Sequence, residues 1–394
     1  MSMRIFINAV FVFLSVSLLL LSCRKVPLVL TQRKTIHVAD VNQLYAAVND
    51  SANAGVVIIL APGTYTLAST KLNAGRLEFQ QDMDLQGQEG NSELVIIDES
   101  ALPVTSFAIP PSFRTGGIRM GRGSNAISWL TVKGNPSSSA LSNIDTDLTW
   151  SGIIRIRVSH IISKEGQNGL DVRNPGFAGE NRVIEADIDH NEFVNNNIGA
   201  SQGMEIQNAN GSTGSIIRAN LNINYVHGNN LGMRSFNTAT SNGSIKINST
   251  SDRFEDNGTG CSLTAGASTS QTAIANDNII NFHAFKTIFR NNHGPSLDGT
   301  PAAGIFAAGG FSAVAANSTS NNKLEIGLSG CLFTGNQGVD MNAFGAYSKI
   351  TTLAGKNNSV KIYIVDAPAN VIVQSTASLP AEPGATNVVS VFKY

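Results

Sequence analysis

Residues 169–174 read GLDVRN, and the same pattern returns as GMEIQN at residues 203–208 and as GMRSFN at residues 232–237. Each copy begins with glycine, alternates apolar with polar residues and ends with asparagine. The third copy is looser, because Ser235 stands at an apolar position. Alternation with a period of two is typical of a β-strand that buries one face. These residues therefore predict one strand that recurs along the chain.

The copies recur at similar intervals along the chain. Their glycines lie 34 residues apart from 169 to 203, 29 from 203 to 232, and 28 from 232 to 260. Between copies lies a second alternating segment that ends in an aromatic residue and an asparagine, most clearly at residues 324–336. A unit this short cannot bury its apolar face alone, so the units must stack on one another. The repeat predicts an all-β solenoid that climbs about 4.8 Å per coil.

The closing asparagines predict a polar column inside this solenoid. Asn174, Asn208 and Asn237 occupy the same place in three successive units. Asparagine tolerates the left-handed backbone of a sharp turn, and stacked amides can hydrogen-bond along the axis. We therefore expect a structural Asn column.

Composition excludes one class of partner. Charged residues make up only 14% of the chain, its net charge is −1, and no long basic run occurs. Nucleic-acid binding leaves a basic footprint that is missing here, so we predict no nucleic-acid partner. Cys261 and Cys331 have no metal-type spacing and fall at apolar positions of the repeat, which predicts buried thiols.

The first 22 residues have the features of an export signal. Arg4 is the sole charge before an apolar stretch at residues 5–21, and Ser22 and Cys23 follow it. A membrane-spanning helix is the alternative, although the stretch is at the short limit for one. The segment closely resembles the lipobox of bacterial lipoproteins. That resemblance implies cleavage before Cys23, acylation of its thiol and new amino group, and a tether at residues 23–34. We expect a lipid anchor in the cell envelope, at the outer membrane, and leave open which side of the membrane the protein faces.

The residues that follow carry a second resemblance. A short amphipathic helix is predicted at residues 42–49, where Leu44, Ala47 and Val48 share one face. The segment APGTY at residues 61–65 comes next, and LVIID at residues 94–98 follows it. This order resembles the N-terminal part of pectate-lyase-like right-handed parallel β-helix proteins. The resemblance implies that β-helix over residues 35–375, a capping helix at its start, and a segment at residues 376–394 that closes the last coil.

Alternation also predicts which side chains face outward. If the apolar residues of the repeat point inward, their neighbours form two adjacent columns on the outside. Asp171, Glu205 and Arg234 make up the first column. The carbohydrate-binding candidates are Arg173, Gln207, Arg234, Phe236 and Phe306. Charged groups and amides can hydrogen-bond sugar hydroxyls, and aromatic rings can pack against pyranose C–H faces. Three interpretations stay open for the strip: a solvated ion-pair ladder, a glycan-binding surface, or a catalytic site.

A further outward column is predicted on the aromatic-terminated strand. Glu185 and Asp187 share a face there, and Lys246 stands at the equivalent place two coils on. Two carboxylates at this spacing could contribute to a Ca²⁺ site, although the ion needs six or more oxygen ligands. A charged outer face is the alternative interpretation.

The family resemblance makes carbohydrate chemistry the leading expectation for function, while the fold alone does not decide it. Polysaccharide lyases of this fold need a group that neutralises the substrate carboxylate and a base that removes the neighbouring proton. Arg234 or a cation held by Asp171 and Glu205 could serve as the first, and Lys246 or Arg173 as the second.

Hydrolases of this fold carry adjacent Asp-Asp and a Gly-His-Gly, both of which are missing here. Residues 155–157, RIR, only superficially resemble the family's Arg-Ile-Lys. We therefore expect a lipid-anchored envelope protein that binds or associates with a polysaccharide, and we leave open whether it is catalytic. The alternative is a divergent lyase or hydrolase acting on an acidic polysaccharide, and the oligomeric state stays open.

Overall fold

The computed structural model describes residues 33–109, 113–135, 142–147, 149–150, 153–174, 182–196, 201–209, 212–268, 274–294, 303–312, 319–348, 355–366, 371–379 and 386–394. The signal segment, Cys23 and the tether up to residue 32 lie outside these residues. Within them, no helix has the length and apolar character needed to cross a membrane. Residues 35–394 make up one compact unit.

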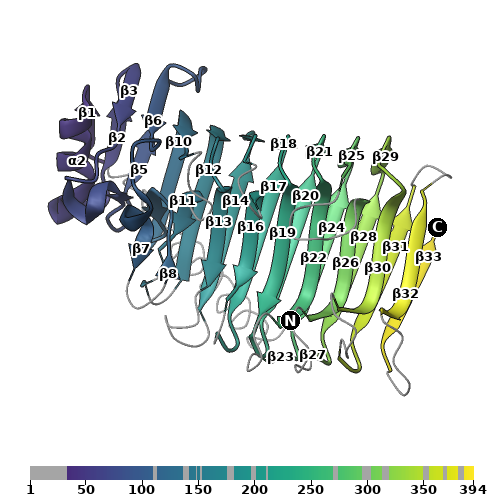
Figure 1. Cartoon of the computed structure of the whole chain (residues 1–394). Helices are drawn as coiled ribbons and strands as arrows, with labels where there is room; N and C mark the ends of the chain where they lie inside the picture. The colour runs from purple at the N-terminus through teal and green to yellow at the C-terminus, as the bar shows by residue number, and fades with distance from the viewer. Residues whose placement is uncertain are drawn as a thin grey trace, which may run out of the picture. The chain divides into compact units, whose positions relative to one another are not determined.

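This unit is a right-handed parallel β-helix, which confirms the predicted fold. A typical coil has a long strand, a sharp corner, a short strand, a turn and a third strand. The first two strands belong to a 19-stranded sheet and the third to a 10-stranded sheet. Strands of successive coils stand side by side in Figure 1, from the purple N-terminal end to the yellow C-terminal end.

The long strands of the 19-stranded sheet pair in parallel in the following order. They are β1 (Thr35–Val38), β2 (Val57–Leu60), β5 (Asp84–Gln86), β10 (Ser124–Lys133), β12 (Ile153–Lys164), β14 (Val183–Asp189), β17 (Ile216–Asn222), β20 (Ser244–Thr250), β24 (Ile279–Phe285), β28 (Lys323–Ser329), β31 (Ser359–Val365) and β33 (Val388–Lys393). The short strands of this sheet are β3 (Gly63–Thr66), β6 (Val95–Asp98), β15 (Glu192–Val194), β18 (Tyr225–His227), β21 (Arg253–Glu255), β25 (Ile288–Arg290) and β29 (Leu332–Thr334).

The 10-stranded sheet contains the repeat from which the sequence analysis began. Its strands, in order along the sheet, are β4 (Leu77–Glu78), β9 (Ile118–Met120), β11 (Ser142–Thr146), β13 (Asn168–Asn174), β16 (Gln202–Asn208), β19 (Leu231–Thr238), β22 (Thr259–Ser268), β26 (Ala303–Ser312), β30 (Val339–Ser348) and β32 (Val373–Leu379). Two small pairs stand apart: parallel β23 (Ala275–Asn276) with β27 (Thr319–Ser320), and antiparallel β7 (Ala108–Ile109) with β8 (Phe113–Arg114). Three 3₁₀ turns occur at Ser51–Asn53, Leu72–Gly75 and Val104–Phe107.

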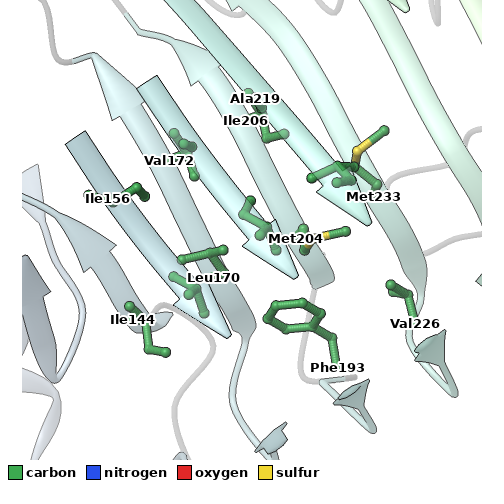
Figure 2. Close-up of a cluster of buried hydrophobic side chains, with 14 of the residues drawn as sticks. Ile144, Ile156, Leu170, Val172, Phe193, Met204, Ile206, Ala219, Val226 and Met233 are labelled. Atoms are coloured by element: carbon green, nitrogen blue, oxygen red, sulfur yellow. The ribbon is translucent and has the colours of Figure 1, made fainter. Parts of the chain in front are cut away.

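The core consists of the apolar residues that alternate inward from these strands. Leu170, Met204 and Met233 occupy one position of β13, β16 and β19, and all three are fully buried. Figure 2 shows them packed beside Phe193 and Val226 from the short strands. Cys261 continues the column on β22 as a buried free thiol, and Cys331 is also buried and free, as predicted.

Close packing explains the glycine that opens each copy of the repeat. A Cβ at Gly169 would lie 2.8 Å from a ring carbon of Phe193, and one at Gly232 would lie 3.1 Å from Phe254. The same Cβ atoms would approach a carbonyl oxygen of the next coil to 2.6 and 2.5 Å, respectively. Real Cβ atoms do not come that close, so these glycines are required by close packing between neighbouring strands.

The N-terminal end of the core is capped as predicted, by helix α2 (Val41–Asn49). The Asp40 carboxylate caps the helix by accepting from the N–H groups of Asn42 and Gln43 at 2.8 and 2.9 Å. Leu44, Ala47 and Val48 are buried, together with Tyr45, which the sequence analysis did not include. The predicted helix therefore covers the end of the β-helix with four side chains.

Asn174, Asn208 and Asn237 form a stacked column, as predicted, near the ends of their strands. The Asn174 Nδ2 group donates to Asn208 Oδ1 at 2.8 Å, and Asn208 Nδ2 donates to Asn237 Oδ1 at 2.7 Å. Their backbone is extended within the strands, so the expected left-handed conformation is wrong for these three. It occurs instead at the corner between the long and short strands, for example at His190 and Ser251, with φ near +55°.

Three further columns of this kind stack in other turns. They are Asn191–Asn224–Asp252, Asn196–Asn229–Asn257–Asn292–Asn336 and Asn278–Asn322–Asn358–Asn387. Each buried amide bonds to the next coil, so the columns fix the register of the whole stack.

Candidate functional site

The predicted strip on the 10-stranded sheet has the expected register. Asp171 pairs with Glu205, and Glu205 pairs with Arg234 on the next strand. In the adjacent column, Arg173 pairs with Gln207, and Gln207 with Phe236. We call the outward side of β11, β13, β16, β19, β22 and β26 the covered face.

Most of the covered face is buried, whereas alternation suggested that it would lie in solvent. Asp171 is 2% exposed, Phe236 6% and Gln207 8%, and Glu205 is also buried. Phe306, expected to be exposed, is fully buried because it packs against Phe344 and the edge of Tyr347. Phe306 is therefore a core residue of this outer layer and is no candidate for sugar stacking.

Ion pairs connect the charged residues of the covered face across several coils. Asp145 pairs in register with Asp171 on the next strand. Both carboxylate oxygens of Asp145 accept hydrogen bonds from the Arg173 guanidinium, and the one from Nε to Oδ1 is 3.2 Å long. Arg173 Nε also lies 3.5 Å from Asp171 Oδ2. Asp171 accepts hydrogen bonds from Asn168 at 2.8 Å and from Ser142. The Asp171 carboxyl is thus held from three sides.

A second set of ion pairs extends this network toward the N-terminal coils. Arg119 bridges Glu78 at 2.9 Å and Asp147 at 3.0 Å, and Arg122 Nε lies 2.6 Å from Asp147. Arg182, which is buried, donates to the Asp147 carbonyl oxygen. These charges repeat coil after coil at about 4.8 Å, so the network runs along the axis of the β-helix.

The carboxylates of the network differ in the direction in which their pKa is shifted. Burial raises the pKa of Asp171 well above its ordinary value, although the Arg173 charge acts in the opposite direction. It also raises the pKa of Glu205, against the charges of Arg234 and Arg173. Burial would raise the pKa of Asp147 too, but the Arg119 charge and hydrogen bonds from neighbouring groups lower it to about 2. Asp171 and Glu205 therefore favour the protonated form more strongly than ordinary carboxylates do.

Arg234 differs from the other arginines of this face. Its guanidinium lies over the Phe236 ring, 4.2 Å from the centroid, and is half-buried. Within the described part of the chain, no carboxylate lies within 4 Å of it and none of its N–H groups has a hydrogen-bond acceptor. Arg234 is thus a fixed cation whose donors are available to a ligand.

Two other sets of site candidates lie outside the covered face, on the 19-stranded sheet. Lys246, a candidate base, lies on β20 of the 19-stranded sheet and does not share a face with Asp171, Glu205 and Arg234. It cannot act with them because it projects from a different side of the β-helix.

Glu185 and Asp187 do share a face, but their oxygens are already bonded within the chain. Glu185 pairs with Arg155 at 2.9 Å and Arg218 at 3.3 Å, and Asp187 accepts from Asn220 at 3.0 Å. The described residues contain no group of three or more potential metal ligands. The predicted Ca²⁺ candidate is therefore an ordinary ion-pair ladder.

We call the outward side of the long strands of the 19-stranded sheet the open face. Hollows of about 390, 340 and 360 Å³ lie among its described residues near the C-terminal end. The largest is lined by residues of β20, β24, β28 and β31, among them His283, Phe285 and Tyr363. The sequence analysis considered Lys246 on β20 but did not predict a hollow here, because a hollow depends on how side chains of neighbouring coils pack.

The sequence analysis also missed seven members of the covered network: Arg76, Glu78, Arg119, Arg122, Asp145, Asp147 and Arg182. The coil of Asp145 and Asp147 lacks the glycine-led copy of the repeat, since β11 reads SNIDT. The coil of Arg119 has the glycine, in GIRM at residues 117–120, but lacks the closing asparagine. The alternation of Asn143, Asp145 and Asp147 was the available signal, and aligning residues 144–147 with 170–173 would have placed them in the strip.

Comparison with known proteins adds little beyond the kind of fold. No protein-family model matches the chain, and no curated protein matches it. Among solved structures, the A-module of mannuronan C-5 epimerase AlgE4 from Azotobacter vinelandii is 12% identical, with a TM-score of 0.40, over 86% of this chain and 99% of that one. Pectate lyase Pel9A is 13% identical, with a TM-score of 0.35, over 90% of this chain and 82% of that one. We transfer no residue role from either structure.

Proposed function

We propose that this chain is a lipid-anchored protein of the cell envelope that binds an acidic polysaccharide on its covered face. The observation that carries the proposal is the half-buried Arg234 guanidinium, which lies over Phe236 and has no carboxylate within 4 Å among the described residues. Its register neighbour Glu205 lies beyond that distance and has a raised pKa. A guanidinium recognises a uronate carboxylate through paired hydrogen bonds, and its partial burial strengthens them.

The charge balance of the network supports an anionic ligand. The described part of the network contains more guanidinium groups than carboxylates. The guanidinium groups belong to Arg76, Arg119, Arg122, Arg173, Arg182 and Arg234, and the carboxylates to Glu78, Asp145, Asp147, Asp171 and Glu205. Because burial raises the pKa of Asp171 and of Glu205, negative charge on this face is reduced further. An incoming carboxylate would meet a surplus of positive charge.

Isothermal titration calorimetry with polygalacturonate and with alginate tests this proposal. Arg234→Ala should weaken binding by about 2 kcal/mol, as expected for an anchoring residue. Arg218→Ala is the matched control, because it removes one guanidinium from the open face, where Arg218 is 52% exposed. If the wild type binds neither polyuronate, or if Arg234→Ala binds as tightly as Arg218→Ala, the covered face is a structural ion-pair network only.

One observation favours a second function, a polysaccharide lyase or hydrolase. Asp171 and Glu205 stand on adjacent coils with raised pKa values, close to Arg173, and a protonated carboxyl beside a guanidinium can serve in acid–base chemistry. The test is to incubate the protein with both polyuronates and to follow the ultraviolet absorbance of unsaturated products and the release of reducing ends. Product formation that Glu205→Gln abolishes would favour the enzyme.

The lipid anchor is a proposal that rests on sequence, because residues 1–32 lie outside the described part of the chain. Metabolic labelling with a fatty acid should mark the wild type. Cys23→Ser should lose the label and leave the membrane fraction, since only the thiol can carry a thioether-linked lipid. Equal labelling of both proteins would contradict the anchor.

A further inference from the structure

The open face changes character along the β-helix. One outward column runs through Asp187, Asn220, Asn248, His283, Gly327, Tyr363 and Phe392 on successive strands. Its N-terminal members are polar or charged, whereas its C-terminal members are aromatic apart from the glycine. Strands β24, β28 and β31 carry this aromatic part, and they lie side by side in the green-to-yellow region of Figure 1. Large apolar side chains are exposed beside it, including Phe285 at 47%.

Gly327 creates a gap within this column. Its backbone is not left-handed, so conformation does not require a glycine at this position. A Cβ there would lie 3.2 Å from His283 Nδ1, which shows that the imidazole leans over the glycine. The missing side chain therefore leaves space between His283 and Tyr363.

Tyr363 forms the opposite wall of this gap. Its ring stacks on Phe392 with 5.1 Å between centroids and 12° between planes. Because Phe392 lies on the next strand toward the C-terminus, one face of Tyr363 is covered and the other looks back toward Gly327. The result is the hollow of about 390 Å³ whose lining includes both His283 and Tyr363.

The lining of the hollow suits a neutral sugar. None of the residues that line it is Asp, Glu, Lys or Arg, and its polar and aromatic groups include Asn248, His283, Phe285 and Tyr363. Amide, hydroxyl and imidazole groups can exchange hydrogen bonds with sugar hydroxyls, while aromatic rings accept pyranose C–H faces. A few polar groups in a mostly apolar hollow are typical of small-ligand sites.

The distance between the two walls of the hollow is compatible with one pyranose ring. His283 and Tyr363 stand two strands apart, roughly 9.6 Å at the usual strand spacing. A ring in van der Waals contact with both walls needs about 7–8 Å, twice the usual contact distance. The lean of His283 over Gly327 narrows the gap toward that width.

We propose that this hollow binds one neutral pyranose unit of an oligosaccharide, between His283 and Tyr363. The site shares no residue with the network of the covered face and does not depend on it. It would give the protein a second saccharide contact, on a different sheet and with different chemistry.

Calorimetry with cellohexaose, xylohexaose, mannohexaose and maltohexaose tests the proposal on the whole protein. At least one of these probes should bind. Tyr363→Ala, which removes one wall, should weaken that binding at least tenfold. Gly327→Leu should do the same by filling the gap while keeping every lining donor and ring. Leu332→Ala is the control, because it removes an exposed apolar side chain outside the hollow.

Thermal unfolding and circular dichroism should show that each variant is folded. The proposal is overturned if no probe binds at millimolar concentration, or if both Tyr363→Ala and Gly327→Leu bind like the wild type. Arg234→Ala should leave binding of the neutral probe unchanged, and Tyr363→Ala should leave binding of polyuronates unchanged. The two sites can therefore fail separately.

Discussion

Asp171 and Asp187 lie on the two different strands of the repeat, β13 and β14, and each alternates outward from its strand. Asp171, on the covered face, is 2% exposed, and burial raises its pKa. Asp187, on the open face, is exposed and accepts a hydrogen bond from Asn220. The same pattern of alternation thus produces a buried charge network on one sheet and a solvated ladder on the other.

The difference shows that outward and exposed are separate properties in a β-helix. Strand geometry decides which residues point away from the core. The energetic role of those residues depends on whether water reaches them, because a buried charge must be paired and hydrogen-bonded. Substitutions of the same kind should therefore have very different effects on the two faces.

The largest effect is expected for Asp145→Ala on the covered face. The Asp145 side chain is fully buried and paired with Arg173, so its removal leaves a buried guanidinium without its main partner. Breaking such a pair costs about 3–5 kcal/mol of unfolding free energy. Urea unfolding should show this loss, whereas Asp187→Ala on the open face should change stability by about 0.5 kcal/mol or less. Equal losses would mean that the two faces are equally solvated.

Asp252, in the turn between β20 and β21, should make the unfolding free energy depend on pH. Asp252 is buried and takes the place of an asparagine in the column after Asn191 and Asn224. Burial raises its pKa to about 6 from the ordinary 3.8, against hydrogen bonds from Ser249 and Asn224. Between pH 4 and pH 6 the folded state therefore binds more protons than the unfolded state, and stability falls as pH rises through this window.

Asp252→Asn should remove this part of the pH dependence, because an amide is neutral and can still accept from Asn224 and bond to Ser249. Relative to the wild type, the variant should gain about 2–3 kcal/mol between pH 4 and pH 7. Urea titrations at several pH values measure the difference. If it stays constant across this range, Asp252 has an ordinary pKa and the column is open to water there.

An intermediate effect is expected for Asn208→Ala at the edge of the covered face. Asn208 is fully buried and bonds to both Asn174 and Asn237, so alanine leaves amide groups unpaired. A loss of about 1–3 kcal/mol follows. Asn220→Ala is the matched control, because Asn220 also bonds to both neighbouring coils but lies in solvent. Similar small losses for both variants would show that stacked amides contribute little in this protein.

The sequence was sufficient to predict the features that depend on local periodicity. The stacking of Asn174 on Asn208, the column of Asp171 and Glu205, and the capping helix all follow from spacing and alternation. Burial of Phe236 and Phe306 could not be derived in this way, since it depends on what packs against the outer side of the sheet. The sequence analysis placed Lys246 and Arg234 on different strands, but which sheet each strand joins depends on contacts between coils.

The candidate hollow was beyond sequence analysis for a related reason. Gly327 resembles any other glycine in a strand, and only its place between His283 and Tyr363 on neighbouring coils gives it meaning. Asp145 and Asp147 were missed because their coil lacks the glycine that marks the later copies. The hollow and the positions of Asp145 and Asp147 both depend on contacts between neighbouring coils, whose residues are distant in the sequence.

The smallest effect is expected for Arg218→Ala on the open face. Arg218 is 52% exposed and reaches Glu185 at 3.3 Å, while Arg155 already pairs with the same carboxylate at 2.9 Å. An exposed pair contributes about 0–1 kcal/mol, and the second guanidinium on one carboxylate contributes less than the first. Salt screens charges in solvent, so the difference from the wild type should disappear near 1 M NaCl. Asp145→Ala should keep most of its loss at that ionic strength, because buried pairs are screened much less. Parallel unfolding curves at low and high salt test this contrast, and a large salt-independent loss for Arg218→Ala would show that the open face is also a buried network.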